Sequence, residues 1–168
     1  AVNSRAMSIS SSGNRNRDCS SGVCLSIDNV DTDAGTLDIY MTNQAGCSYC
    51  DDPLYNTQTL CEVAGNNGTG GTWTFDATID ETTCESSDIN RVYFSGEVAG
   101  FQFYLDGIEI TGVSGGTADE YMDLVNFNAS SGKILGTSFS GSTIPAGSGI
   151  LTQVAFSDYN DSDICAEN

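Results

Sequence analysis

Apolar and polar residues alternate along several separate stretches of the chain. Val23, Leu25 and Ile27 alternate with Cys, Ser and Asp residues, and the same pattern recurs further on. The stretches concerned are 23–27, 37–41, 73–79, 101–105, 108–110, 135–139 and 150–156. A period of two places one face of a strand in a core and the other in water. The chain is therefore predicted to be all-β, an antiparallel β-sandwich, and no segment shows a convincing helical period.

The dipeptide Asp106-Gly107 separates two of these stretches. Asp-Gly between alternating apolar runs is a strong signal for a β-hairpin with a two-residue loop. We therefore expect residues 101–105 and 108–110 to form the two strands of a hairpin.

Residues 44–90 interrupt the alternation. They contain an Asp-Pro turn at 52–53, a glycine-rich run at 65–71 and four of the seven cysteines: Cys47, Cys50, Cys61 and Cys84. A segment with so little apolar content needs staples to stay folded. We interpret it as a disulfide-stapled insertion in a single β-sandwich domain that spans residues 19–168.

Cys47 and Cys50 have the spacing of a redox pair or of half a zinc site. A redox pair needs a thiolate stabilised by a helix N-terminus or a cation, and the sequence indicates neither. A zinc site would need Cys61 and Cys84 as its other ligands, and these are not a second close pair. The pattern favours structural disulfides, and the spacing leaves their pairing open.

Charge is distributed unevenly along the chain. Its 168 residues include 5 Lys+Arg, 23 Asp+Glu and no His, which gives a formal net charge of −18. The first 17 residues hold three of the five cations and no acidic residue. We interpret residues 1–18 as an extended basic arm with the alternation of a strand at 5–10. Its candidate assembly residues are Val2, Arg5, Met7, Ile9, Arg15 and Arg17.

The acidic balance argues against binding to nucleic acid or to an anionic membrane surface, because both depend on cations. The sequence has no histidine, which is the usual general base and the commonest zinc ligand. It has a single lysine, Lys133, so Schiff-base chemistry is not favoured either. We expect no enzymatic activity and no cofactor. A carbohydrate-active enzyme is the alternative, and it rests only on the accidental carboxylate pairs that 23 acids provide.

Several features favour an extracellular protein. The chain begins at Ala1 without a basic, apolar leader, so we expect that a signal peptide has been removed. No apolar run is long enough to span a bilayer, and seven cysteines are typical of an oxidising compartment. The sequons at Asn67, Asn128 and Asn160 predict covalent glycans.

Two further groups of side chains suggest ligands. Asp31, Asp33 and Asp38 surround a glycine turn with a spacing that begins like a calcium-binding loop. The pattern lacks the third ligand and the distal Glu, so an acidic turn is the favoured interpretation and calcium the alternative. Trp73, Tyr40 and Tyr49 suggest a sugar-stacking platform, and the simpler interpretation is a core position for Trp73.

Two blocks of sequence carry a family resemblance. The first, at 24–40, reads CLSIDNVDTDAGTLDIY, and the second begins with VAGFQFYLDGIEITGVSGG at 98–116 and ends with ILGTSFSGSTIPAGSGIL at 134–151. Together they resemble cohesin-like modules, which are jelly-roll β-sandwiches of secreted and cell-surface proteins. The resemblance implies a fold and an extracellular context, and it does not transfer a dockerin-binding surface.

The resemblance also implies a disulfide. In the resembled sandwich the first and last strands lie near each other, which implies a Cys24–Cys165 bond. Cys47, Cys50, Cys61 and Cys84 then pair among themselves, and Cys19 is the candidate for the unpaired cysteine.

An arm followed by a sandwich also looks like a subunit of extracellular fibres that are joined by donated strands. We therefore expect a structural protein that polymerises head to tail with its own copies, the arm adding a strand to the next subunit. The alternative is a cohesin-like module of a secreted or cell-surface scaffold that binds a protein or a carbohydrate.

Overall fold

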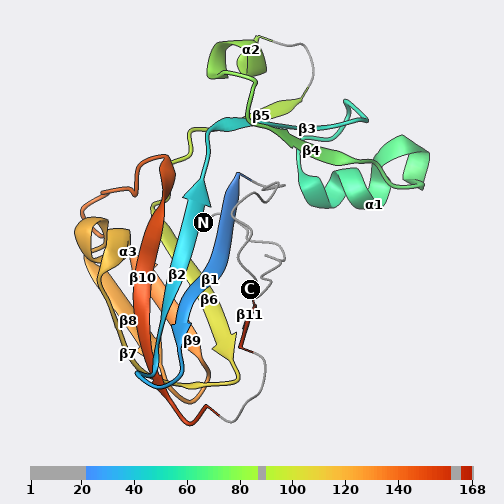
Figure 1. Ribbon diagram of the computed structural model, residues 1–168. Helices are drawn as coiled ribbons and strands as arrows, with labels where there is room; N and C mark the ends of the chain where they lie inside the picture. The colour runs from blue at the N-terminus through green and yellow to red at the C-terminus, as the bar shows by residue number, and fades with distance from the viewer. Residues whose placement is uncertain (1–21, 87–89, 160–163, 168) are drawn as a thin grey trace. The chain divides into compact units, whose positions relative to one another are not determined.

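The computed structural model describes residues 22–86, 90–159 and 164–167, with Cys165–Glu167 described as backbone only (Figure 1). Within these residues the chain forms two compact units. The larger unit contains residues 24–42 and the described residues from 98 onward. The smaller unit contains residues 22–23 and the described part of 43–97.

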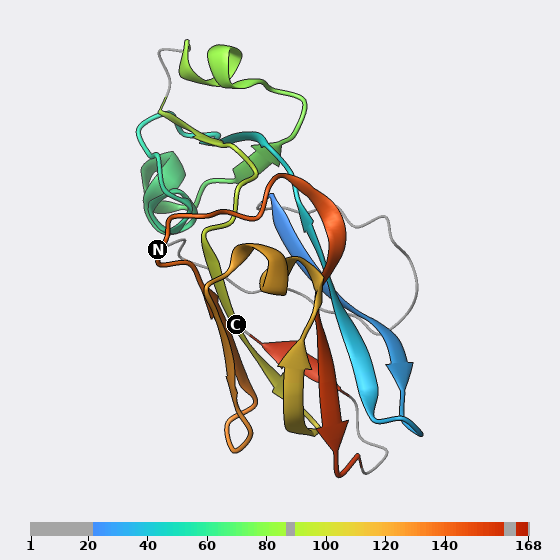
Figure 2. The same ribbon diagram turned by 90° about the vertical axis from the view of Figure 1, so that its left-hand side faces the viewer.

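Two four-stranded antiparallel sheets form the larger unit. One sheet has the strand order β1 (Val23–Asp31), β2 (Thr36–Asn43), β10 (Gly147–Ser157) and β7 (Glu109–Ser114). The other has the order β11 (Cys165–Glu167), β6 (Gly100–Asp106), β9 (Lys133–Thr137) and β8 (Leu124–Asn128). The two views show these sheets face to face (Figures 1 and 2). The predicted antiparallel β-sandwich is therefore confirmed.

The core of the larger unit consists of the inward positions of both sheets. On β2, Leu37 and Ile39 are fully buried, and on the opposite sheet Phe103 and Ile134 pair across β6 and β9. The other buried apolar residues of the strands are Leu25, Ile27, Met41, Leu105, Ile110, Leu151, Val154 and Phe156. On β1, β2 and β6 these residues recur at every second position, as the alternation in the sequence predicts. On β9 the buried apolar side chain is Ile134 and not the predicted Leu135, and on β10 Leu151 is buried whereas the predicted Ile150 is exposed.

The predicted hairpin at Asp106-Gly107 is wrong. β6 and β7 belong to different sheets, because β6 pairs with β9 and β11 while β7 pairs with β10. The favoured two-residue hairpin turn with Asp-Gly needs a positive φ at both residues. Here Gly107 has a φ of 90°, whereas Asp106 is not among the residues with positive φ. The turn therefore carries the chain from one sheet to the other.

The described residues also contain three short helices, although no segment of the sequence shows a convincing helical period. They are α1 (Gln58–Gly68), α2 (Glu81–Glu85) and α3 (Gly116–Tyr121). The regular part of α1 ends before Gly65, where the backbone leaves helical angles. Local side chains start two of them: Thr57 Oγ1 accepts from the Leu60 N–H, and Asp80 Oδ1 accepts from the Thr83 N–H. Segments this short carry almost no periodic signal.

The smaller unit contains a three-stranded antiparallel sheet with the order β4 (Trp73–Asp76), β3 (Gly46–Cys50) and β5 (Arg91–Phe94), together with α1 and α2. The strand expected over 73–79 ends at Asp76. The Asp76 carboxylate there accepts hydrogen bonds from the N–H and the hydroxyl of Thr78 and turns the chain toward α2.

Replacing Gly132 by alanine tests the packing of the larger unit. Gly132 has a φ of 66°, and a Cβ there would lie 2.1 Å from the carbonyl oxygen of Leu105. We expect Gly132→Ala to lower the free energy of unfolding by roughly 2 kcal/mol or more, measured by urea unfolding with far-ultraviolet circular dichroism. Gly147→Ala is the control, because nothing lies within 4 Å of its added carbon. Equal losses in the two variants would contradict this packing.

Candidate functional site

Two disulfides staple the smaller unit, and both start from β3. Cys47 bonds to Cys84 of α2, and Cys50 bonds to Cys61 of α1. All four cysteines are buried. Cys47 and Cys50 therefore belong to different disulfides, so their close spacing forms neither a redox pair nor a thiolate zinc site. The disulfide-stapled insertion predicted from the sequence is present.

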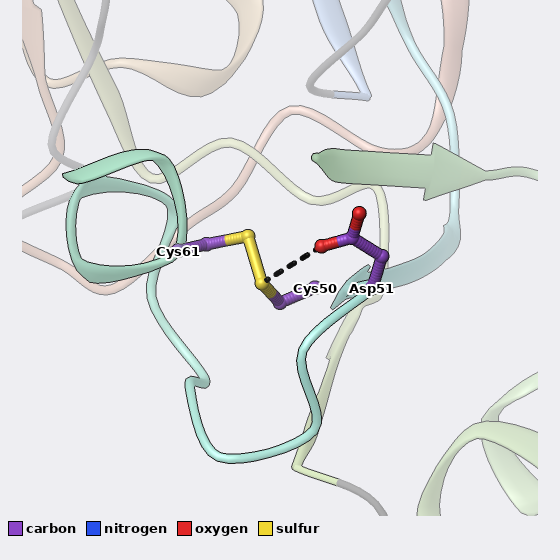
Figure 3. Close-up of side chains that lie close together, drawn as sticks. All are labelled: Cys50, Asp51 and Cys61. Carbon is purple, nitrogen blue, oxygen red and sulfur yellow. Dashed lines mark hydrogen bonds between the residues drawn. A yellow bond between two sulfur atoms is a disulfide. The ribbon is translucent and has the colours of Figure 1, made fainter. Parts of the chain in front are cut away.

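Asp51 lies beside the Cys50–Cys61 bond, with its Oδ1 atom 3.7 Å from the sulfur of Cys50 (Figure 3). Within the described residues, these three are the single group of potential metal ligands that lie close together. A disulfide sulfur carries neither a proton nor a negative charge, so it is neither a donor to Asp51 nor a thiolate ligand. One carboxylate remains, which is too few for a metal centre.

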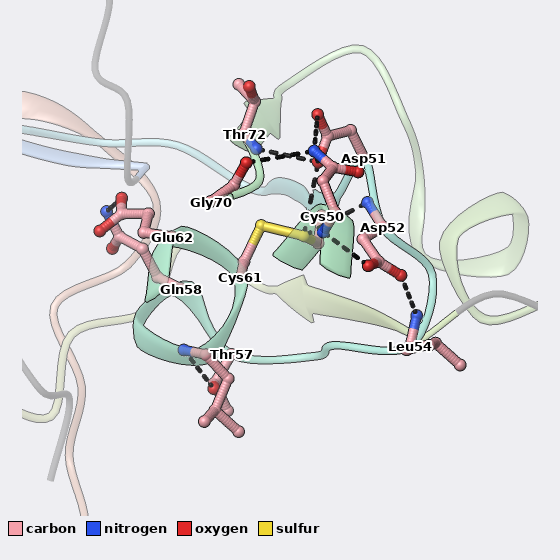
Figure 4. The surroundings of a disulfide bond; sticks show 12 residues. Cys50, Asp51, Asp52, Leu54, Thr57, Gln58, Cys61, Glu62, Gly70 and Thr72 are labelled. Atoms are coloured by element: carbon pink, nitrogen blue, oxygen red, sulfur yellow. Dashed lines mark hydrogen bonds between the residues drawn. A yellow bond between two sulfur atoms is a disulfide. The ribbon is translucent and has the colours of Figure 1, made fainter. Parts of the chain in front are cut away.

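The Asp51 carboxylate instead holds the glycine-rich segment that follows α1 (Figure 4). Its Oδ1 atom accepts from the Thr72 N–H at 2.9 Å, and the Asn66 side-chain amide lies 3.4 Å from both of its oxygens. The hydrogen bond from the Thr72 backbone is the main reason that the pKa of Asp51 is lowered from its ordinary value. Asp51 therefore acts as an anionic anchor for this loop.

Asp52 and the disulfide complete the anchoring. The Asn66 N–H donates to Asp52 Oδ2 at 2.8 Å, and Asn66 and Asn67 both lie in the left-handed region. Gly71 packs on the disulfide, where a Cβ would lie 3.0 Å from both sulfur atoms. Residues 65–72 thus form a defined loop, although their composition alone suggests a flexible one.

The structure places two of the three predicted glycosylation residues on the surface. Asn67 is exposed in the anchored loop. Asn128 is exposed at the end of β8, where its side-chain oxygen accepts from the N–H and the hydroxyl of Ser130 in its own sequon. Asn160 lies outside the described residues. Both described sequons are accessible to a modifying enzyme, and whether they carry glycans stays a prediction.

The three aspartates considered as calcium ligands do not come together. Asp31 Oδ1 accepts from the N–H groups of Asp33 and Ala34 within the turn. Asp38, only 6% exposed, instead accepts from the side-chain amides of Asn29 and Gln153. Asp31 therefore shapes the turn, as expected for an acidic turn. Asp38 instead links its own strand, β2, to β1 and β10.

The stretch 135–139, which the alternation predicts to be a strand, ends as a strand at Thr137 and leaves an aromatic side chain exposed beyond it. Phe139, 76% exposed, follows β9 in a serine-rich loop. Asp123 Oδ2 accepts from the N–H groups of Phe139 and Ser140 at 2.7 and 2.8 Å and from two serine hydroxyls. The bonds from Ser140 contribute most to lowering the pKa of Asp123 to about 2. Asp123 thus fixes the backbone of this loop, while the side chain of Phe139 is exposed to solvent.

The smaller unit also exposes apolar side chains. Leu54, Leu60 and Val63 are between 51% and 77% exposed, and the last two lie three residues apart on α1. A spacing of three residues between apolar side chains is the feature of the sequence that could have indicated a helix with an apolar, exposed side. Trp73 is half-buried in β4 beside Cys50.

The remaining predicted residues are described only in part. Cys24 is disulfide-bonded, and the backbone of Cys165 lies opposite Asp106 at the start of β11. The side chain of Cys165, Cys19 and the assembly residues of the arm lie outside the described residues. The Cys24–Cys165 bond, the unpaired Cys19 and the role of the arm stay predictions.

Comparison with protein-family models, with curated proteins and with solved structures finds no match to this chain. In the described part of the chain, none of the helices has the length and apolar character required to cross a bilayer.

Removing the Cys50–Cys61 disulfide tests its role as a staple. Replacing both cysteines by alanine should lower the stability of the smaller unit by roughly 3 kcal/mol, because the bond restricts the unfolded chain. Trp73, the single tryptophan, reports on this unit through its fluorescence, since it pairs with Cys50 across β3 and β4. Thr59→Ala, at an exposed position of the same helix, is the control. If both variants unfolded with the same denaturation midpoint, the disulfide would not stabilise the smaller unit.

The Asp123 anchor predicts a specific pH dependence. Its pKa is depressed in the folded protein, so its stabilising effect is fully present above the ordinary value of 3.8 and is lost as pH falls through about 2. The amide chemical shifts of Phe139 and Ser140 should therefore change with a midpoint near pH 2, and Asp123→Asn should remove this titration. Amides of β9 serve as the internal reference. A midpoint close to 4 would mean that the carboxylate is not held by these bonds.

Proposed function

We propose that this protein is a structural subunit of an extracellular filament. Subunits join head to tail, and residues of the basic arm, 1–18, add a strand to the β-sandwich of the neighbouring subunit. The observation that carries the proposal is the uneven distribution of charge along the sequence. The arm is basic and its apolar and polar residues alternate as in a strand, whereas the sequence that follows is strongly acidic. Its cohesin-like, jelly-roll character belongs to the same proposal and rests on the blocks at 24–40 and 98–151.

Strand addition provides both affinity and specificity. Backbone hydrogen bonds to a sheet edge supply affinity, and alternate side chains supply specificity by entering the core. In the arm, Met7 and Ile9 are two residues apart and would enter the same core. Sheet edges are normally protected against such pairing, and a dedicated arm uses an edge in a controlled way.

Charge would favour the pairing of an arm with a neighbour. Residues 18–168 hold all 23 acidic residues and only two cations, Arg91 and Lys133. The guanidinium of Arg91 lies 5.1 Å from the ring centre of Tyr49, within its own unit. Arg5, Arg15 and Arg17 are three of the five cations in the chain, and they would supply most of the positive charge that meets an acidic neighbour.

Disulfides and sequons support the extracellular location. Disulfides persist in oxidising compartments and are rare in the cytosol. Asn67 and Asn128 are exposed in sequons, so glycans at these positions would cover a surface without disturbing the core.

A binding module is the second candidate, and Phe139 is the observation that favours it. A 76% exposed aromatic residue on a loop anchored by Asp123 is suited to bind a partner protein or a sugar ring. A glycan array and a pull-down with glycosylated wild-type protein would detect such a partner. Phe139→Ser should then abolish the binding, and the absence of partners in both assays would refute this function.

Removal of the arm tests the filament directly. We expect the wild-type protein to form filaments in negative-stain images at native concentration. The chain lacking residues 1–17 should give folded monomers, because the strand that joins subunits is gone. Filaments that persist without the arm would refute strand donation.

A pair of full-length variants separates the apolar contribution from the charge. Met7→Ser combined with Ile9→Ser should abolish assembly, because no apolar side chain then enters the neighbour. Ser8→Ala combined with Ser10→Ala is the matched control and should assemble normally. Both variants keep the three arginines of the arm, so a difference between them cannot come from net charge.

A further inference from the structure

The two edges of β6 are paired to different extents. On one side, β9 pairs with β6 over Gly100–Tyr104. On the other side, β11 pairs only with Tyr104, Leu105 and Asp106. Among the described residues, no strand pairs with residues 100–103 on this side of β6, and this half of the β6 edge is here called the unpaired half.

The backbone of Gln102 is directed at this unpaired half. The Leu105 N–H donates to the Gly132 carbonyl at 2.9 Å, on the β9 side of β6. Alternate residues of a strand direct their backbone N–H and C=O groups to the same side. The backbone groups of Phe103 and Phe101 therefore also point toward β9. Gln102 faces the opposite side and offers one donor and one acceptor to a further strand.

The inner face of the sandwich beside this edge is apolar and incompletely covered. Phe101 and Phe103 point to the same face, with ring centres 6.0 Å apart. Phe103 is 1% exposed, whereas Phe101 is only partly buried. The Phe101 ring lies over Gly136 of β9, where a Cβ would approach it to 2.3 Å. The ring is thus directed toward β9, away from the unpaired half of the edge.

Three other edge strands of the larger unit, β1, β7 and β8, are less suited to accept a further strand. β7 and β8, at the opposite side of the sandwich, lie against each other. β1 is interrupted near its end by Asn29, whose φ of 50° breaks the regular strand, and such irregularities discourage pairing.

We propose that residues 100–103 of β6 accept residues 5–10 of the arm of a second copy of this chain. The inference rests on the proposed filament and names the acceptor within it. Met7 and Ile9 have the same two-residue spacing as Phe101 and Phe103, and they enter the core beside Phe101. Ser8 then lies outside next to Gln102, with which its backbone exchanges hydrogen bonds.

A proline at position 102 tests this acceptor in the full-length protein. Gln102→Pro removes the N–H that faces the unpaired edge, while the N–H groups that face β9 are kept, so the strand is expected to tolerate it. We expect the variant to show wild-type circular dichroism and at least a tenfold higher critical concentration for assembly. Gln102→Thr keeps the N–H and is the matched control, which should assemble like the wild type. Normal assembly of a folded Gln102→Pro variant would overturn the proposal.

Hydrogen exchange of the wild-type protein gives an answer that does not depend on the variant. In filaments, the Gln102 amide should exchange at least tenfold more slowly than in dilute monomers. New protection at β1, β7 or β8 without protection at Gln102 would overturn the β6 acceptor. Strand donation would still stand in that case if arm deletion abolishes filaments. Filaments that persist without the arm would instead refute the proposed function itself.

Discussion

Burial of alternating apolar side chains between the two sheets is the constraint on which this structure depends. Leu37 and Ile39 on one sheet, and Phe103 and Ile134 on the other, are almost completely removed from water. A register shift of one residue in any of these strands would turn its apolar set toward solvent. The turn at Asp106-Gly107 carries the chain from one sheet to the other, so that strands on both sides of it contribute residues to this core.

The smaller unit is held by a different kind of interaction. Its sheet has short strands, and the side chains of β4 are only partly buried. Two disulfides and a set of carboxylates take over the role that a larger core would have. Asp51 and Asp52 fix the loop after α1, and Asp76 and Asp80 fix the turn that leads into α2. Acidic residues that contribute to a large net charge thus have specific structural tasks.

The sequence predicted β1, β2 and β6 with their buried faces, because burial has the same period as the backbone. It did not predict β8, and on β9 it placed Leu135 rather than Ile134 in the core. It did not predict where Asp106-Gly107 leads, since the choice between a hairpin and a crossover depends on distant strands such as β9 and β10. The helices escaped detection because α2 has only five residues and depends on one capping aspartate. Cys47 and Cys50 could be assigned to disulfides, but their partners depend on how α1 and α2 pack. The Phe139 loop was missed because its anchor, Asp123, lies 16 residues away.

The disulfide between Cys47 and Cys84 has a consequence for the chain under mechanical tension. It joins residues that are 37 positions apart, and an extended chain spans about 3.4 Å per residue. When the polypeptide is stretched from its ends, this single covalent bond therefore prevents about 120 Å of the chain from extending. The smaller unit can lose its fold under force and still add little to the length of the molecule. A protein built in this way can be extended only to a limited length before a covalent bond must break.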